Sequence, residues 1–112
     1  MTKNISSIEK CAKLMGIDYY GHAVGKVYRS GLSGYDQEPV EFNPLTNKSD
    51  LMGLECTLGI DVTWLVEGVR ASNYDDGVFQ VDIYFADHPD KFTARAHAVI
   101  AVAVQIYDRT NP

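Results

Sequence analysis

The sequence predicts an α+β fold: a three-layer α-β-α sandwich around a small antiparallel sheet, with residues 1–112 in one domain. Two stretches begin with helix-capping residues and continue with apolar residues at helical spacing, and a third, alanine-rich stretch follows near the end. Between them lie segments in which apolar and polar residues alternate, as in half-buried strands. A length of 112 residues, with 46% hydrophobic and 22% charged residues, is typical of one globular domain.

The first helix is expected over residues 6–16. Ser6 is a natural N-cap, and Glu9, three residues later, completes a capping box. Gly16 supplies a residue that ends helices, with Ile17 placed for the apolar contact of a Schellman cap. One face of this helix is apolar and consists of Ile8, Cys11, Ala12 and Met15.

The segment from 19 to 41 has no sustained period. Glycines and tyrosines interrupt any regular pattern, and only residues 24–29 suggest a short strand. We therefore expect an irregular excursion with short strands. So long a segment inside a small domain is either functional or faces a partner.

A second helix is expected to follow Asn43. Pro44 keeps Asn43 extended, and Asn47 can cap the helix. Asp50 would then lie in the first turn, where the helix dipole favours a carboxylate. Leucines at 51, 54 and 58 share one face, and Gly59-Ile60 provides a terminator like the one at residues 16–17.

Two strands are expected next, over residues 62–69 and 79–85, joined by turn-forming residues at 73–77. The second strand has a period-2 apolar stripe that consists of Phe79, Val81, Ile83 and Phe85. The first strand has apolar groups on both faces, because Leu65 and Val69 oppose Trp64. We expect Trp64 to lie in the core.

The last element is ambiguous by propensity. Residues 99–104 are rich in β-branched side chains, which favour a strand. Many alanines favour a helix, and roughly sixteen residues without a breaker are long for a strand. A helical apolar stripe also favours a helix, and it consists of Phe92, Ala96, Val99, Ala103 and Ile106. We predict a helix entered near Pro89. It should cover the apolar stripe of the second strand, while the second helix covers the opposite face with Leu65 and Val69.

The net charge limits the classes of partner. Ten Lys and Arg against fifteen Asp and Glu give −5, which weighs against DNA binding and against a membrane-surface protein. No apolar run approaches a membrane span, and residues 1–4 lack a signal-peptide core, so we expect a cytoplasmic location. In that compartment Cys11 and Cys56 are expected to be free, small apolar residues.

Residues that could perform catalysis are scattered. His22, His88 and His97 stand at no metal-ligating spacing, and no Cys-x-x-Cys occurs, so no metal and no cofactor is expected. The segment 31–34 does not complete the Gly-x-Ser-x-Gly pattern of a nucleophile elbow. We expect no enzymatic activity, and a phosphodiesterase-type hydrolase is the alternative.

The composition permits binding of an anionic nucleotide, because guanidinium groups pair with phosphate and bases stack on rings. Residues 1–39 carry five Lys and Arg against four Asp and Glu, a cationic share above that of the rest of the chain. The alternative for each candidate is structural: tyrosines pack, arginines form ion pairs, and a histidine is hydrogen-bonded in its helix. The candidate ligand-binding residues are Tyr19, Tyr20, Lys26, Tyr28, Arg29, Arg70, Arg95 and His97.

Two short segments and the order of elements point to a family. Lys13-Leu14-Met15-Gly16 ends the first helix, and Phe42-Asn43-Pro44-Leu45-Thr46-Asn47 precedes the second, which is followed by a Trp-bearing strand, an aromatic strand and an alanine-rich helix. Over residues 5–18 and 40–107 this arrangement resembles the phage ABA-sandwich domain family. The family has a Trp beside its Met-Gly, where this chain has Ile17 and Tyr19. The resemblance implies an α-β-α layered fold, a phage or prophage origin and no established enzymatic chemistry.

From this resemblance we expect a non-enzymatic phage accessory protein in the cytoplasm of the infected bacterial host. One hypothesis is a homo-oligomeric binding module that sequesters a nucleotide-type immune signal, such as a cyclic nucleotide or an ADP-ribose derivative, with residues 19–35 in the binding wall. The alternative is an interaction factor that binds a host protein and no small molecule. Exposed sheet edges in so small a domain favour self-association.

Overall fold

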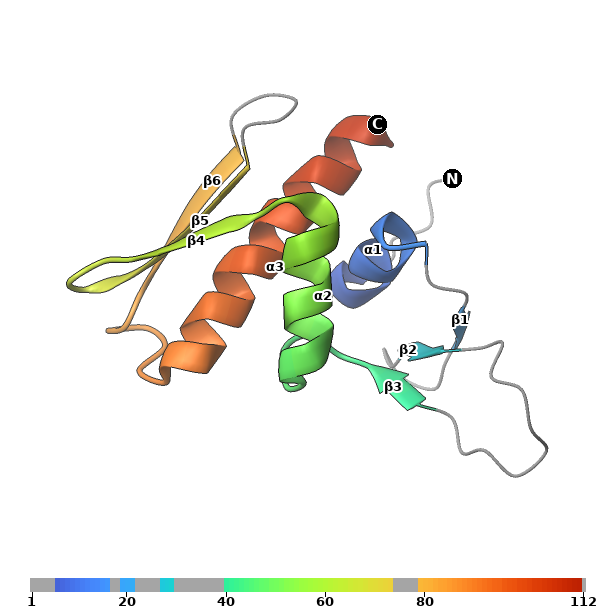
Figure 1. Cartoon of the computed structure of the whole chain (residues 1–112), viewed down its shortest axis with the longest axis horizontal. Helices are drawn as coiled ribbons and strands as arrows, with labels where there is room; N and C mark the ends of the chain where they lie inside the picture. Colours follow the sequence, from blue (N-terminus) through green and yellow to red (C-terminus); the bar gives the residue numbers. More distant parts are fainter. Residues whose placement is uncertain (1–5, 17–18, 22–26, 30–39, 74–78, 112) are drawn as a thin grey trace.

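The computed structural model describes residues 6–16, 19–21, 27–29, 40–73 and 79–111. The strands form two antiparallel sheets, in the orders β1-β2-β3 and β4-β5-β6. The α+β class with a small antiparallel sheet is confirmed. Along the chain the elements are α1 (Ser7–Leu14), β1 (Tyr19–Gly21), β2 (Val27–Arg29), β3 (Val40–Phe42), α2 (Lys48–Leu58), β4 (Asp61–Trp64), β5 (Gly68–Asn73), β6 (Phe79–Tyr84) and α3 (Lys91–Thr110) (Figure 1).

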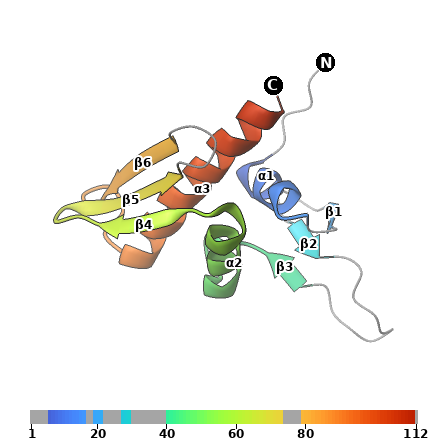
Figure 2. The same ribbon diagram turned by 45° about the horizontal axis from the view of Figure 1, so that its top comes forward.

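Helix α3 lies at the centre of the fold, and residues 99–104 are helical as predicted. The β4–β6 sheet packs against one side of α3, while α1 and α2 pack against the other (Figures 1 and 2). The layers therefore follow the order sheet, α3, then α1 with α2. Because it is covered on both sides, α3 buries residues around much of its circumference, namely Ala94, Ala96, Ala98, Val99, Ile100, Val102 and Ala103.

The single strand predicted over residues 62–69 is wrong, because the chain reverses inside it. The Leu65 N–H donates a hydrogen bond to the Gly68 carbonyl oxygen at 2.8 Å, which closes a tight turn around Val66 and Glu67. Such turns usually contain Asn-Gly, Asp-Gly or another glycine pair, so this one has no recognisable turn signal. The predicted apolar strand is therefore two antiparallel strands, β4 and β5.

The reversal also changes which face of the sheet each side chain occupies. Val69 pairs with Trp64, and both lie on the side that faces α3. The opposite face is polar and includes the cross-strand pair of Arg70 and Asp82. We expected α2 to cover a second apolar face with Leu65 and Val69. Instead Val69 is fully buried on the α3 side, and α2 packs against α3.

Both predicted helix starts are confirmed. Ser6 accepts a hydrogen bond from the Glu9 backbone N–H at 3.1 Å, and Asn47 accepts one from the Asp50 N–H at 3.1 Å. The Asp50 carboxylate, which is 5% exposed, accepts a hydrogen bond from the Asn43 N–H at 2.9 Å. Asp50 thus ties the chain before α2 to the first turn of the helix.

The predicted ends of these two helices are also confirmed. Gly16 and Gly59 have φ angles of 69° and 66°, in the left-handed region that favours glycine. After Gly59 the Ile60 N–H donates to the Glu55 carbonyl oxygen at 2.9 Å, as in a Schellman cap. Ile17, the proposed apolar partner at the first helix, lies outside the described residues.

The excursion over residues 19–41 contains short strands, as expected. β1, β2 and β3 have three residues each and pair in antiparallel order. The strand expected over 24–29 is described from Val27 onward, and residues 22–26 and 30–39 lie outside the described residues. β3 leads directly into the capped start of α2.

Both cysteines are free, as predicted, but their surroundings differ. Cys11 is fully buried in the core, and burial raises the pKa of its thiol to about 12. Cys56 is exposed on α2, so the expectation that it packs as a small apolar residue is wrong.

Candidate functional site

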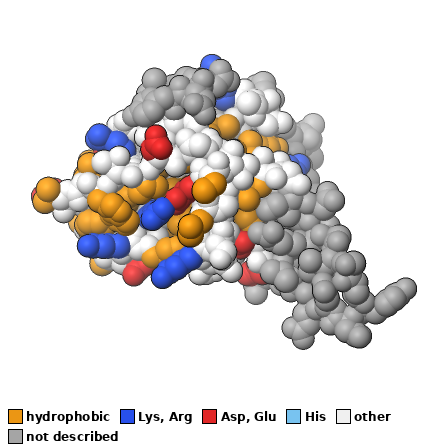
Figure 3. All heavy atoms as spheres, in the orientation of Figure 1, with side chains coloured by type: hydrophobic (Ala, Val, Ile, Leu, Met, Phe, Trp, Pro, Cys, Tyr) orange, Lys and Arg blue, Asp and Glu red, His pale blue; other side chains and the backbone are white. Residues whose placement is uncertain are grey.

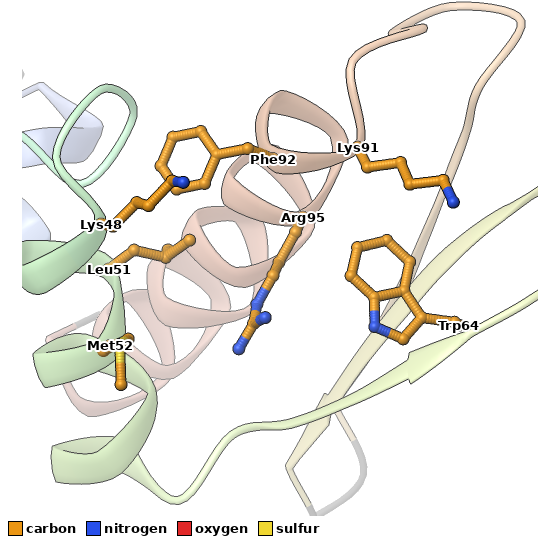
Figure 4. Close-up of a pocket in the computed structure, with 7 residues that line it drawn as sticks. All are labelled: Lys48, Leu51, Met52, Trp64, Lys91, Phe92 and Arg95. Carbon is orange, nitrogen blue, oxygen red and sulfur yellow. The ribbon is translucent and has the colours of Figure 1, made fainter.

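A cleft of about 300 Å³ opens between α2, β4 and the first turns of α3 (Figure 4). Three of the side chains that line it are cationic, and the other four are apolar or aromatic. The lining residues are Lys48, Leu51, Met52, Trp64, Lys91, Phe92 and Arg95.

Local structure explains why these side chains meet. Lys48 and Lys91 are the first residues of α2 and α3, so the starts of both helices lie at the cleft. On α3, Arg95 follows Lys91 by four residues and therefore projects from the same helix face. The β4–β5 register turns Trp64 toward α3, so its indole forms the opposite wall (Figure 4).

Arg95 is held in place by Glu55 of α2. Its Nε donates to Glu55 Oε2 at 2.8 Å and its Nη2 donates to Oε1 at 2.5 Å, a two-point contact between helices. The Glu55 side chain is 10% exposed and that of Arg95 is 32% exposed. The hydrogen bonds to Glu55 raise the pKa of the Arg95 guanidinium, so Arg95 stays charged at the cleft.

The two lysines of the cleft interact with their surroundings more weakly than Arg95 does. Neither Lys48 nor Lys91 forms an ion pair with another part of the described chain, and the Lys48 Nζ lies 6.0 Å from the centre of the Phe92 ring. Asp90 caps α3 by accepting from the Thr93 N–H and hydroxyl, which lower the pKa of its carboxyl, and Lys48 lowers that pKa further. Two ammonium groups thus remain available at the cleft.

The expectation that Trp64 lies in the core is wrong. Its side chain is 49% exposed, and its indole stacks on Phe85 with ring centres 6.4 Å apart and an interplanar angle of 29°. Met52 on the facing helix is 59% exposed. In the space-filling view, apolar surface on the side of β4 and α2 is flanked by Lys and Arg side chains (Figure 3). The indole therefore packs on Phe85 and is also exposed to solvent.

The predicted ligand-binding residues do not all gather at one site. Arg95 lies in the cleft, but Arg70 lies on the outer face of the sheet, where its Nε donates to Asp82 Oδ1 at 2.8 Å and its Nη2 donates to Oδ2 at 3.1 Å. His97 is half-buried on α3 and stacks on His88, with ring centres 4.2 Å apart. Burial, and secondarily the charge of His88, lower the pKa of His97.

The candidates in the excursion belong to β1 and β2 by their backbone. Tyr19 pairs with Arg29, and Tyr20 pairs with Tyr28. The structure describes these backbones and not the side chains, and Lys26 lies outside the described residues.

Sequence reasoning missed most of the cleft. Lys48 and Lys91 directly follow Asn47 and Asp90, the caps of α2 and α3, and this repeated pattern was available as a signal. The sequence pattern places Phe92 in the apolar stripe of the closing helix and Trp64 in the core. The two side chains line one cleft because the end of β4 lies beside the first turns of α3.

Comparisons with known protein families, with curated proteins and with solved structures found no match to this chain. Among the described residues, no group of three or more His, Cys, Asp or Glu is arranged to hold a metal ion. None of the described helices is long and apolar enough to cross a membrane.

Proposed function

We propose that this protein is a non-enzymatic binding module whose cleft takes a small aromatic anion of nucleotide type. The observation that supports this proposal most directly is that three cationic side chains and the exposed indole of Trp64 line one cleft. Residues 40–112 contain five Lys and Arg against eleven Asp and Glu, yet three of those five line this cleft. Such local concentration in an acidic chain favours an anionic ligand.

The chemistry of the lining supports binding rather than turnover. Its side chains offer guanidinium and ammonium donors, a thioether and apolar or aromatic surface. Charged donors form the stronger hydrogen bonds to phosphate, and indole rings supply stacking surface for bases. Of the carboxylates near the cleft, Glu55 is engaged by Arg95 and Asp90 accepts hydrogen bonds from Thr93.

The biological setting is proposed from the resemblance to the phage ABA-sandwich domain family. In that setting the module is a phage accessory protein in the cytoplasm of the infected host, where it sequesters a nucleotide-type immune signal as a homo-oligomer. Multi-angle light scattering tests the oligomer: we expect a mass at least twice 12.4 kDa, and a monomer at high concentration would reject self-association.

Calorimetry tests the binding function. The full chain is titrated with AMP, cyclic AMP, cyclic di-AMP and ADP-ribose, and at least one should bind. A variant with Lys48→Gln and Lys91→Gln should bind at least about tenfold more weakly, since hydrogen bonds to charged groups contribute about 1.5–3 kcal/mol each. Lys13→Gln, at an exposed lysine of α1, is the matched control and should bind as the wild type does. Absence of heat with all four ligands would reject the proposal.

A second candidate function, binding of a host protein, is favoured by the β4–β5 turn. Val66 at this turn is 98% exposed and borders a second hollow with Tyr84 and Phe85. If this surface binds a protein, Val66→Ser should abolish capture of one defined protein from bacterial lysate. The Lys48 and Lys91 double variant should still capture it.

A further inference from the structure

The cleft has two chemically different ends, and this difference bears on the class of ligand. We infer that the cleft binds one nucleotide with a phosphate monoester, the base lying on Trp64 and the phosphate lying near Lys48 and Lys91. The inference rests on the proposed function and makes it narrower: a nucleoside monophosphate is favoured over a cyclic phosphodiester.

The positions of the side chains support this orientation. Figure 4 shows Lys48 and Lys91 at the end of the cleft where α2 and α3 begin, with Lys48 beside the ring of Phe92 and Lys91 above Trp64. Trp64 and Arg95 lie farther along, on opposite walls. A ligand with one flat apolar part and one anionic part matches this division, because each part meets side chains of the corresponding kind.

The charge at the cleft matches a monoester. Lys48, Lys91 and Arg95 supply three positive charges, and Glu55 offsets one of them through its contact with Arg95. Two positive charges remain among the lining side chains, while the nearby Asp90 carboxylate accepts hydrogen bonds from the Thr93 N–H and hydroxyl. These two positive charges are close in number to the charge of about −1.5 to −2 of a phosphate monoester at pH 7. A phosphodiester has one negative charge for each phosphate and would leave part of this positive charge unbalanced.

The size of the cleft sets the number of nucleotides. A volume of about 300 Å³ is at the lower end of the range for small-molecule sites. It corresponds to about ten water molecules, each of which occupies about 30 Å³ in the liquid. A cleft of this size accordingly favours a small ligand, and we assign it one base with its sugar and phosphate.

Trp64 provides a direct readout, because it is the only tryptophan in the chain. Its exposed indole should change fluorescence when a base stacks on it. Titrations of the full chain with AMP, cyclic AMP, adenosine and inorganic phosphate, followed by calorimetry and by Trp64 fluorescence, test the inference. We expect AMP to bind one to one and at least about tenfold more tightly than cyclic AMP or adenosine. Phosphate should bind without changing the fluorescence.

Two further measurements separate the parts of the ligand. Lys48→Gln and Lys91→Gln should each lower the affinity for AMP and leave that for adenosine unchanged, while Lys13→Gln changes neither. Because the second pKa of a monoester is about 6, AMP affinity should fall from about pH 7.5 to about pH 5.5, while that of cyclic AMP should stay constant. Trp64→Leu should remove the preference for AMP over phosphate, and Tyr84→Leu, equally exposed on the opposite sheet face, should retain it.

The outcomes distinguish this inference from the proposed function. Binding of cyclic AMP, cyclic di-AMP or ADP-ribose as tightly as AMP would overturn the monoester preference and leave a nucleotide-binding cleft. AMP binding that is insensitive to both lysine substitutions would overturn the assigned orientation. If no nucleotide binds by either method, the proposed function itself is wrong.

Discussion

The ion pair between Glu55 and Arg95 joins α2 to α3, and its removal should destabilise the fold by a predictable amount. Glu55→Ala leaves a guanidinium without its carboxylate at a site where 32% of the Arg95 side chain is exposed. Breaking a fully buried pair costs about 3–5 kcal/mol, whereas exposed pairs contribute about 0–1 kcal/mol. Because Arg95 retains partial access to water, we expect a loss of about 2 kcal/mol. For a chain of this length that lowers the melting temperature by roughly 8 °C.

A double-mutant cycle isolates the pair from the packing lost in each variant. Urea unfolding of wild type, Glu55→Ala, Arg95→Ala and the double variant, followed by far-ultraviolet circular dichroism, gives the coupling energy. We expect a coupling of about 1.5 kcal/mol, since hydrogen bonds to charged groups are worth about 1.5–3 kcal/mol and this pair is partly hydrated.

The chain contains a matched control for this cycle. Lys10 and Asp108 form an ion pair at 2.8 Å, with side chains 22% and 55% exposed. The same cycle on that pair should give about 0.5 kcal/mol or less. A Glu55–Arg95 coupling no larger than that of the control would refute the reasoning that burial of Glu55 strengthens the contact.

Four other predictions follow from local geometry and burial. Gly53→Ala should raise the free energy of unfolding by about 0.5–1 kcal/mol, because a Cβ there meets only the end of a flexible side chain at 3.2 Å and α2 gains a better helix former. Gly68→Ala should lower it by more than about 2 kcal/mol, since its Cβ would lie 2.3 Å from a backbone oxygen of β6; equal melting of the two variants would contradict this. Because the pKa of His97 is lowered in the folded state, the unfolded chain binds its proton first as pH falls below about 6.5. Stability should therefore fall with pH more steeply in wild type than in His97→Gln, as measured by thermal melting. Iodoacetamide should label native protein once, at Cys56, because burial keeps Cys11 protonated; two adducts on folded protein would disprove this.

The helix starts and ends were predictable because they depend on neighbouring residues. Ser6 and Asn47 bond to N–H groups three residues away, and Gly59 satisfies carbonyl groups of its own last turn. The energy that fixes these caps is local, so the sequence pattern contains it in full.

The order of the layers depends on contacts between residues that are far apart in the sequence, so it was harder to predict. Residues 62–69 predict one strand with two apolar faces, and such a strand would lie in a sheet covered on both sides. In the structure α3 takes the central position, and because it is covered on both sides it contains a continuous apolar run over residues 98–104. The β-branched members of this run favour a strand, which is why residues 99–104 are ambiguous in the sequence. The continuous run itself is the sequence signal of a helix that is buried on both sides.

The candidate site was the least predictable part. Its lining comes from residues 48–52, 64 and 91–95, three segments far apart in the chain. Arg95 was identified from its chemistry alone. Trp64 and Phe92 were assigned to the interior because large rings usually lie there, and only the position of the β4 end beside the two helix starts turns them into cleft walls.

The central position of α3 has a consequence for synthesis. The sheet on one side and α1 with α2 on the other share this helix as their common neighbour, and it is the last of the described elements in chain order. At about 5–20 residues per second, its 20 residues take roughly one to four seconds to translate. During that time the apolar faces of both halves lack their covering helix on the ribosome. Nascent chains at this stage should therefore recruit chaperones more strongly than chains in which α3 is complete.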